Sequence, residues 1–188
     1  MKKGLIAIVA VLVIIGILAA SVFGSYNSLV ALDEKVNNQW ANVESKLQRR
    51  YDLIPNLVES VKGAMAQEKE VFTAIADARS KMAGAQTTDE KVEASNQLES
   101  AIGRLLVVVE NYPELRSNAN VTALMDELAG TENRISTERD RYNEAVSQYN
   151  ATIRKFPKNI LAGMFGFEQR SYFEATEGAE TAPQVKFN

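Results

Sequence analysis

Residues 29–65 read LVALDEKVNNQWANVESKLQRRYDLIPNLVESVKGAM, and apolar side chains recur there at every third or fourth position. A recurrence of about 3.5 residues places these side chains on one face of an α-helix, as in a left-handed coiled coil. The same phase continues through Phe72, Ile75 and Met82, which predicts one long helix over residues 29–82. Pro55 lies inside it and removes a backbone hydrogen bond, which predicts a kink or break at that point.

An uncharged run lies on the N-terminal side of this stretch. Residues 4–23, GLIAIVAVLVIIGILAASVF, contain Ser21 as their one polar side chain. Twenty helical residues are about 30 Å long, which matches the hydrocarbon core of a bilayer. The run therefore predicts a single-pass transmembrane helix at residues 4–23, bound to the lipid bilayer. A cleaved signal peptide is the alternative, because residues 19–21 (Ala-Ala-Ser) offer a small-residue cleavage site.

The charges that flank this run predict its orientation. Lys2 and Lys3 precede it, whereas Lys35 is the one basic residue within about fifteen positions after it. The positive-inside rule then places residues 1–3 in the cytoplasm and residues 24–188 outside it, at the cell membrane. A cytoplasmic bundle is the alternative.

Two more helical segments follow toward the C-terminus. Thr87 and Glu90 have the spacing of a capping box, and the helix behind them is expected to stop before Pro113. Asn118 offers an N-cap for a third long helix, which Pro157 is expected to end. The apolar face of this third helix is formed by Val121, Leu124, Met125, Leu128, Ile135, Tyr142, Val146, Tyr149, Ile153 and Phe156.

These segments predict an all-α fold. An N-terminal transmembrane helix is followed, over residues 24–173, by an elongated antiparallel bundle of long, kinked amphipathic helices, since none can bury its apolar stripe alone. Residues 174–188 are polar and predict a disordered tail. The 3.5-residue repeat is compatible with a homo-oligomer and equally with a monomer that buries the whole stripe.

The composition excludes many kinds of chemistry. The chain has no cysteine and no histidine, which excludes thiol nucleophiles, Ser-His-Asp triads, histidine-ligated zinc and the Glu-x-x-His motif of di-iron bundles. A net charge of −3 gives no basic excess for nucleic acid. We therefore expect no catalytic residue, no cofactor, no metal, no small-molecule substrate and no nucleic-acid partner.

Several short sequence motifs are more specific than a generic helical bundle requires. In their order and spacing they resemble the LemA family of bacterial membrane-anchored helical proteins over residues 1–173. The motifs are QRRYDLIPNLV (48–58), NYPEL (111–115), GTENRI (130–135), RYNEAVSQYN (141–150) and FPKNI (156–160). The resemblance implies an all-helical fold, a single N-terminal anchor, no established catalytic activity, and other envelope proteins as possible partners. One departure is Gln67-Glu68, where family members often carry His-Glu.

Two groups of residues are candidate interaction sites. The first surrounds the predicted kink and admits two interpretations: a polar recognition site, or a structural cluster in which Arg49 and Asp52 pair at i,i+3. Its members are Arg49, Arg50, Asp52, Pro55 and Asn56. The second is the apolar piece at 160–167, with Phe165 and Phe167, which either caps the core or contacts another subunit or the membrane.

Two tyrosines, Tyr142 and Tyr149, fall on the apolar face of the third helix, and each is followed by asparagine. Core packing with a satisfied hydroxyl is the favoured interpretation for both. Taken together, the patterns predict a non-enzymatic, membrane-anchored scaffold or adaptor of the bacterial cell envelope that acts through helix-face contacts. A secreted or released helical binding module is the alternative, and an enzyme is less favoured.

Overall fold

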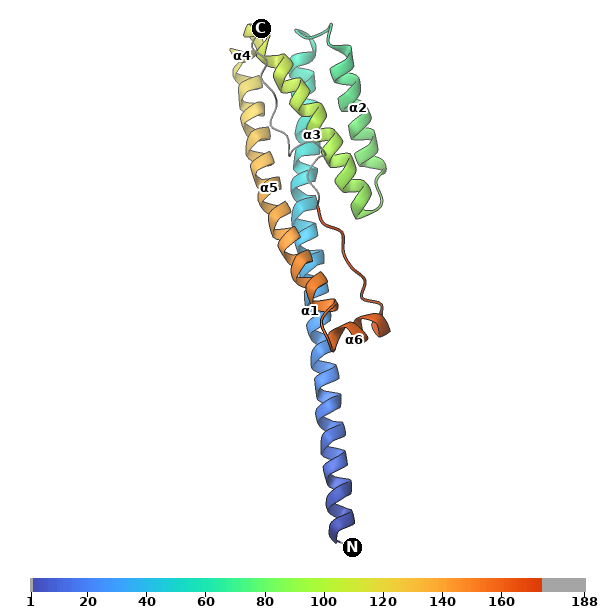
Figure 1. Cartoon of the computed structure of the whole chain (residues 1–188). Coiled ribbons are helices and arrows are strands. Elements are labelled where there is room, and N and C mark those ends of the chain that lie inside the picture. Colours follow the sequence, from blue (N-terminus) through green and yellow to red (C-terminus); the bar gives the residue numbers. More distant parts are fainter. Residues whose placement is uncertain (1, 174–188) are drawn as a thin grey trace, which may run out of the picture. The chain divides into compact units, whose positions relative to one another are not determined.

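The computed structural model describes residues 2–173, and within them all regular secondary structure is helical (Figure 1). The helices are α1 (Lys2–Lys62), α2 (Lys69–Gly84), α3 (Thr88–Glu110), α4 (Pro113–Arg116), α5 (Ala119–Ile153) and α6 (Lys158–Phe165). The predicted all-α fold class is confirmed. The tail predicted at residues 174–188 lies outside the described residues.

The predicted single helix over residues 29–82 is wrong at one point. Helix α1 continues through Pro55 and ends at Lys62, and a turn over residues 63–68 separates it from α2. Gly63 opens this turn, and glycine lowers the cost of leaving the helix. The turn buries Met65 completely, so an apolar residue still occurs at the helical spacing. Periodicity alone therefore does not distinguish this turn from continued helix.

The described chain divides into two compact units. The first consists of residues up to 41 together with 140–172, and the second of residues 42–139 together with Phe173. Helices α1 and α5 each contribute to both units, and each unit is described separately below.

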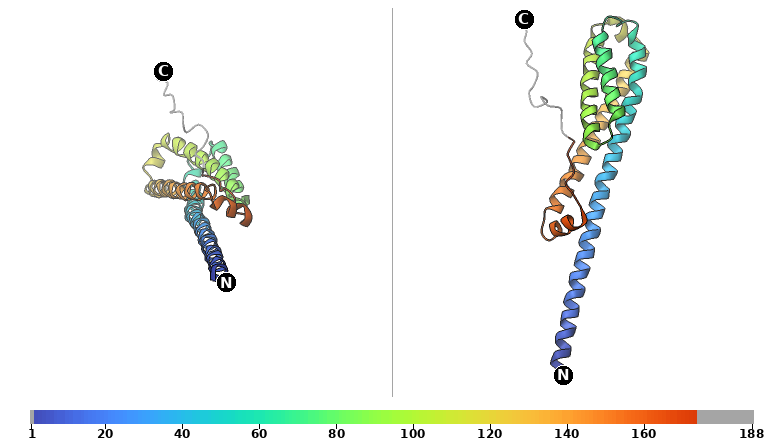
Figure 2. Two further views of the ribbon diagram at one scale, coloured as in Figure 1. Left: turned by 60° about the horizontal axis from the view of Figure 1, so that its bottom comes forward. Right: turned by 90° about the vertical axis from the view of Figure 1, so that its right-hand side faces the viewer.

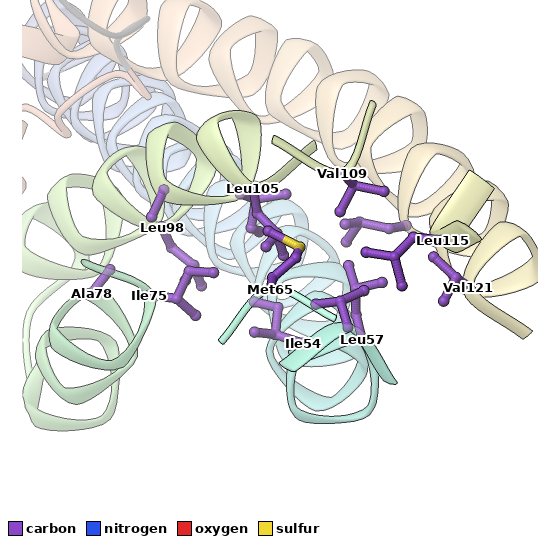
Figure 3. Close-up of a cluster of buried hydrophobic side chains, with 14 residues drawn as sticks. Ile54, Leu57, Met65, Ile75, Ala78, Leu98, Leu105, Val109, Leu115 and Val121 are labelled. Atoms are coloured by element: carbon purple, nitrogen blue, oxygen red, sulfur yellow. The ribbon is translucent and has the colours of Figure 1, made fainter. Parts of the chain in front are cut away.

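The second unit is a helical bundle with a continuous apolar core. Helices α2 and α3 form an antiparallel hairpin (Figure 1), and the predicted capping box at Thr87 and Glu90 is present at the start of α3. Asn118 also caps α5 as predicted, since its Oδ1 accepts from the backbone N–H groups of Asn120 and Val121. Each buried Val, Leu, Ile or Met side chain contributes about 1.5–3 kcal/mol, and an alanine contributes less. Figure 3 shows ten of them labelled: Ile54, Leu57, Met65, Ile75, Ala78, Leu98, Leu105, Val109, Leu115 and Val121.

The first unit packs α1 against the C-terminal part of α5 and against α6. Leu29 and Val36 of α1 are buried, as are the predicted apolar positions of α5 from Tyr142 to Ile153. The rings of Trp40 and Tyr142 meet edge to face with centroids 5.4 Å apart. Phe156 departs from the prediction, because α5 ends at Ile153 and leaves this ring 81% exposed.

The N-terminal part of α1 contains an apolar surface of unusual length. An 18-residue window has a mean hydropathy of 2.7, and none of this window is buried within the protein. Among the described residues, α1 is the helix that is long and apolar enough to cross a membrane. A helix that is apolar on all sides and unburied requires an apolar surrounding.

Candidate functional site

The structure brings two of the motifs quoted above, QRRYDLIPNLV and GTENRI, together at a buried ion cluster in the second unit. This "Arg50 cluster" consists of Arg50, Ser95, Glu99, Glu132 and Arg139. Arg50, on α1, is fully buried and donates from Nη1 to Glu132 Oε2 of α5 at 2.9 Å. Its Nη2 donates to the backbone carbonyl of Ser95 on α3 at 3.1 Å, and also to the Ser95 hydroxyl. One guanidinium therefore links three helices.

The other half of the Arg50 cluster is built around a second arginine. Arg139 Nη2 donates to Glu99 Oε2 at 3.0 Å and to the Ser95 hydroxyl at 3.3 Å. Its guanidinium carbon also lies 4.3 Å from the centroid of the Phe173 ring, which is a cation–π contact. The positive charges of Arg50 and Arg139 are thus neutralised by the carboxylates of Glu99 and Glu132.

Burial and charge act in opposite directions on Arg50. Burial lowers the pKa of its guanidinium, and the charge of Glu132 and the hydrogen bond to it partly oppose this effect. The guanidinium nevertheless stays charged, because arginine is not deprotonated in proteins. The two carboxylates are more accessible, because Glu132 is 36% and Glu99 39% exposed, and water therefore also solvates them.

The chemistry of the Arg50 cluster favours a structural role. A serine nucleophile needs a base that accepts its proton, whereas Ser95 Oγ faces two guanidinium groups, which only donate. The charged groups are engaged with one another, and their geometry holds α1, α3 and α5 at one level.

The remaining residues of the predicted polar site lie elsewhere on α1. Arg49 is exposed and pairs with Glu127 of α5 at 2.6 Å, and Asp52 is exposed and accepts from Gln48 Nε2 at 2.8 Å. The predicted i,i+3 pair of Arg49 with Asp52 is therefore wrong, because each has a different partner. Asn56 is also exposed, and Pro55 is half-buried within the helix. The structure thus separates Arg50 from an exposed group formed by Arg49, Asp52 and Asn56.

A second polar cluster lies in the first unit and was not predicted as a site. Asn150, which is buried, donates from Nδ2 to the carbonyl of Arg170 at 2.8 Å and accepts from the Arg170 N–H at 2.9 Å. The Arg170 guanidinium donates to Asp33 Oδ1 of α1 at 2.8 Å and 3.2 Å, which raises the pKa of Arg170. The Tyr142 hydroxyl donates to the Ser171 carbonyl at 2.9 Å.

These contacts, the "Arg170 clamp", hold the non-helical segment 166–172 against α1 and α5. Burial raises the pKa of Tyr149 beside it, and the Asp33 charge adds to that effect. The prediction of buried tyrosines with bonded hydroxyls is confirmed for Tyr142. The sequence signal for the Arg170 clamp was the asparagine that follows Tyr149, because a buried amide needs partners on both of its sides.

The apolar piece that contains Phe165 and Phe167 also lies in the first unit. The Phe165 ring centroid is 4.8 Å from that of Tyr26 on α1, and Phe167 is 6.0 Å from the same ring. Phe167 is half-buried, whereas Phe165 is 53% exposed. The piece therefore contacts α1 with one side and solvent with the other.

No metal-binding group was found among the residues that the structure describes: no three Asp, Glu, His or Cys side chains gather there in an arrangement that fits an ion. A hollow of about 330 Å³ lies between α1 and the segment 165–170, with Asp33, Tyr149 and Arg170 in its wall. Asp33 and Arg170 are paired with each other, and Glu168 is the third charged residue of the wall.

Comparison with known proteins gives one family and several relatives. The model of the LemA family matches residues 39–187. Magnetosome protein MamQ 2 of Paramagnetospirillum magneticum is 30% identical over 200 residues, which cover 93% of this chain and 73% of that protein. Magnetosome protein MamQ of Magnetospirillum gryphiswaldense is 28% identical, covering 85% and 70%. Protein LemA of Metamycoplasma hominis is 24% identical, covering 87% and 75%.

Proposed function

The chain belongs to the LemA family, and from this premise we propose that it is a non-enzymatic scaffold or adaptor of the bacterial cell envelope. In this proposal α1 anchors the protein in the cell membrane, and the two helical units bind other envelope proteins or a second copy through exposed helix faces. The names of the relatives refer to the family and to the magnetosome and mention no reaction.

The observation that carries the proposal is the unburied apolar part of α1. A window of mean hydropathy 2.7 with none of it buried would expose a large apolar surface to water. Such a surface is tolerated in a bilayer, where the helix satisfies all its own backbone hydrogen bonds. The flanking lysines support an orientation with the two units outside the cytoplasm.

The non-enzymatic part of the proposal is supported by how the polar side chains are used. The hydrogen bonds from Arg50 in the Arg50 cluster and from Asn150 in the Arg170 clamp join separate segments of the chain. In the Arg50 cluster the Ser95 hydroxyl faces two guanidinium groups, whereas acid–base and covalent catalysis require a general base beside the nucleophile.

The face proposed for partner binding is the exposed group on α1. Asp52 and Asn56 point away from the core, and the described hydrogen bonds at these residues lie within α1. Replacing Asp52 or Asn56 therefore tests partner binding while the contacts between helices stay in place. Surfaces of this kind bind a partner helix through residues spaced three and four apart.

Topology and partner binding are tested with single thiols, because the natural chain has no cysteine. Ala64→Cys places a thiol in the exposed turn after α1. Labelling of intact cells by a membrane-impermeant maleimide is expected, and protection until lysis would overturn the proposed orientation. A photo-crosslinker at Asn56→Cys should yield a heavier product in cells, and the exposed Ser100→Cys on α3 is the matched control.

The mass of the crosslinked product distinguishes the two kinds of partner. Twice the mass of the chain indicates a second copy, and another mass indicates a different envelope protein. Equal yields at Asn56 and Ser100, or none at either, would contradict binding through this face of α1. An intact mass that lacks residues up to about 21 would instead favour the released binding module.

A further inference from the structure

Helix α6 has apolar residues on both of its sides. Leu161 and Ala162 are buried against the first unit, whereas Ile160 is 53%, Met164 72% and Phe165 53% exposed. Together with Phe156, which is 81% exposed, these exposed side chains form the "α6 patch" (Phe156, Ile160, Met164 and Phe165). A helix at the surface of a water-soluble protein carries polar residues on its outer side. The outer side of α6 is therefore built for another environment.

The position of α6 along α1 identifies that environment. Lys158 Nζ donates to Ser28 Oγ of α1 at 2.9 Å, and Phe165 meets the ring of Tyr26. The right-hand view of Figure 2 shows α6 beside this part of α1. Helix α6 thus lies next to the residues that directly follow the uncharged run 4–23.

Helix α6 contacts α1 only a short distance beyond the end of the uncharged run 4–23. Five residues from Phe23 to Ser28 correspond to about 7.5 Å of helix. The polar headgroup layer on each side of a bilayer is about 5–8 Å thick. If the run 4–23 spans the hydrocarbon core, as the proposed function holds, then α6 lies at the depth of the headgroups.

The chemistry of this region fits a lipid headgroup layer. Residues 145–167 contain three cations (Arg154, Lys155 and Lys158) and no acidic residue, in a chain with more acidic than basic residues overall. Aromatic rings next to cations are typical of segments that lie in the membrane interface. Tyr26, Phe165 and Phe167 gather three rings at this level.

A second copy of the chain is a poorer match for the α6 patch. Side chains of 150–250 Å² that are half to four-fifths exposed present on the order of 500 Å² in total. Stable protein interfaces bury about 800 Å² on each partner. We propose that the α6 patch inserts into the headgroup region of the bilayer that α1 spans, and so holds the first unit against the membrane surface.

The test uses the full chain with one cysteine at a time, labelled with an environment-sensitive fluorophore. The protein is reconstituted in vesicles of equal parts phosphatidylcholine and phosphatidylglycerol that carry nitroxide lipids. Met164→Cys probes the α6 patch and Val13→Cys the membrane span. Glu144→Cys is the matched control, exposed on α5 about 13 Å before its end.

The proposal predicts a blue-shifted emission at Met164→Cys and a loss of fluorescence to nitroxides placed near the headgroup. Val13→Cys should be quenched mainly by nitroxides deep in the acyl chains. Glu144→Cys should be quenched neither by these nor by the nitroxides near the headgroup. If Met164→Cys matches Glu144→Cys while Val13→Cys is quenched, the α6 proposal is overturned and the span stands. If Val13→Cys is unquenched, the membrane anchor itself fails. A blue shift at Met164→Cys without lipid quenching would overturn the proposal in favour of a second copy.

Discussion

Arg50 Nη1 lies 2.9 Å from Glu132 Oε2, so a residue of α1 and a residue of α5 that are 82 positions apart share an ion pair. Burial differs between the partners, because Arg50 is fully buried and Glu132 is 36% exposed. The two ends of the pair therefore contribute differently to stability, and this difference is measurable.

Removing the carboxylate is expected to cost more than removing the guanidinium. Glu132→Ala leaves a buried cation with Glu99 as its remaining carboxylate neighbour, at 3.9 Å, and unpaired buried charges cost about 3–5 kcal/mol. Arg50→Met leaves Glu132 accessible to water, so the loss is that of the hydrogen bonds, about 1–3 kcal/mol. Urea unfolding of the full chain in detergent, followed by circular dichroism, measures both. A larger loss in Arg50→Met would contradict the asymmetry.

The exposed group on α1 is expected to be nearly neutral for folding. Asp52→Ala removes a hydrogen bond to Gln48 within one helix, and Asn56→Ala changes an exposed side chain. Surface substitutions of this kind stay within about 0.5 kcal/mol. The same urea titration checks the result, with Arg50→Met as the destabilised reference. Loss of the crosslinked partner in a fully stable Asp52→Ala would identify the residue as a binding residue rather than a structural one.

The capping box at the start of α3 makes a local contribution. Thr87 Oγ1 accepts from the Glu90 N–H at 3.2 Å, and the Glu90 carboxylate accepts from the Thr87 N–H at 3.1 Å. Thr87→Ala removes one of these bonds and is expected to cost about 1 kcal/mol. Hydrogen exchange of the first turn of α3 should accelerate while α5 is unchanged. Thr137→Ala, which changes an exposed threonine within α5, is the control.

Glu90 links this cap to pH. The backbone N–H groups of Gln86 and Thr87 donate to its carboxylate and hold the pKa of Glu90 below its ordinary value. Because the folded pKa is lowered, the stabilisation is fully present above the unfolded pKa of about 4.3 and is lost as pH falls through the folded value. The stability of the natural chain should therefore fall more steeply than that of Glu90→Gln in acid. Parallel curves for the two proteins would show that Glu90 makes no such contribution.

The Arg170 clamp is expected to depend on the Asn150 side chain. Asn150→Ala removes both hydrogen bonds to the backbone of Arg170, and leaving buried groups unpaired costs about 1–3 kcal/mol. Exchange of the Arg170 amide should therefore accelerate by roughly 5- to 100-fold, since each 1.4 kcal/mol is about tenfold. Asn159→Ala, at an exposed position of α6, is the matched control. An unchanged rate at Arg170 would mean that Tyr142 and Asp33 hold the segment without Asn150.

The apolar pattern predicted which faces are buried more reliably than where helices end. The apolar positions that recur every three or four residues are buried or partly buried, because a 3.5-residue repeat indicates one packed face. They are Leu29, Leu32, Val36, Trp40, Val43, Leu47, Tyr51, Ile54, Val58, Val61, Met65, Phe72, Ile75 and Met82. The break at 63–68 escaped the pattern because Met65 enters the core from a turn. The cap at Thr87 was predictable, since its hydrogen bonds join residues three apart.

What the sequence determined by itself was local: the apolar run at 4–23, the helical faces, the caps, and the exclusion of cysteine and histidine chemistry. These features depend on residues close together in the chain, whose geometry within a helix is known in advance. Tertiary structure alone decided that Arg50 is buried and Arg49 exposed, although the two are adjacent, and that Asn150 clamps Arg170. Such pairings depend on which helices pack together and at what level, and the periodicity of one helix carries no information about the level of its neighbour.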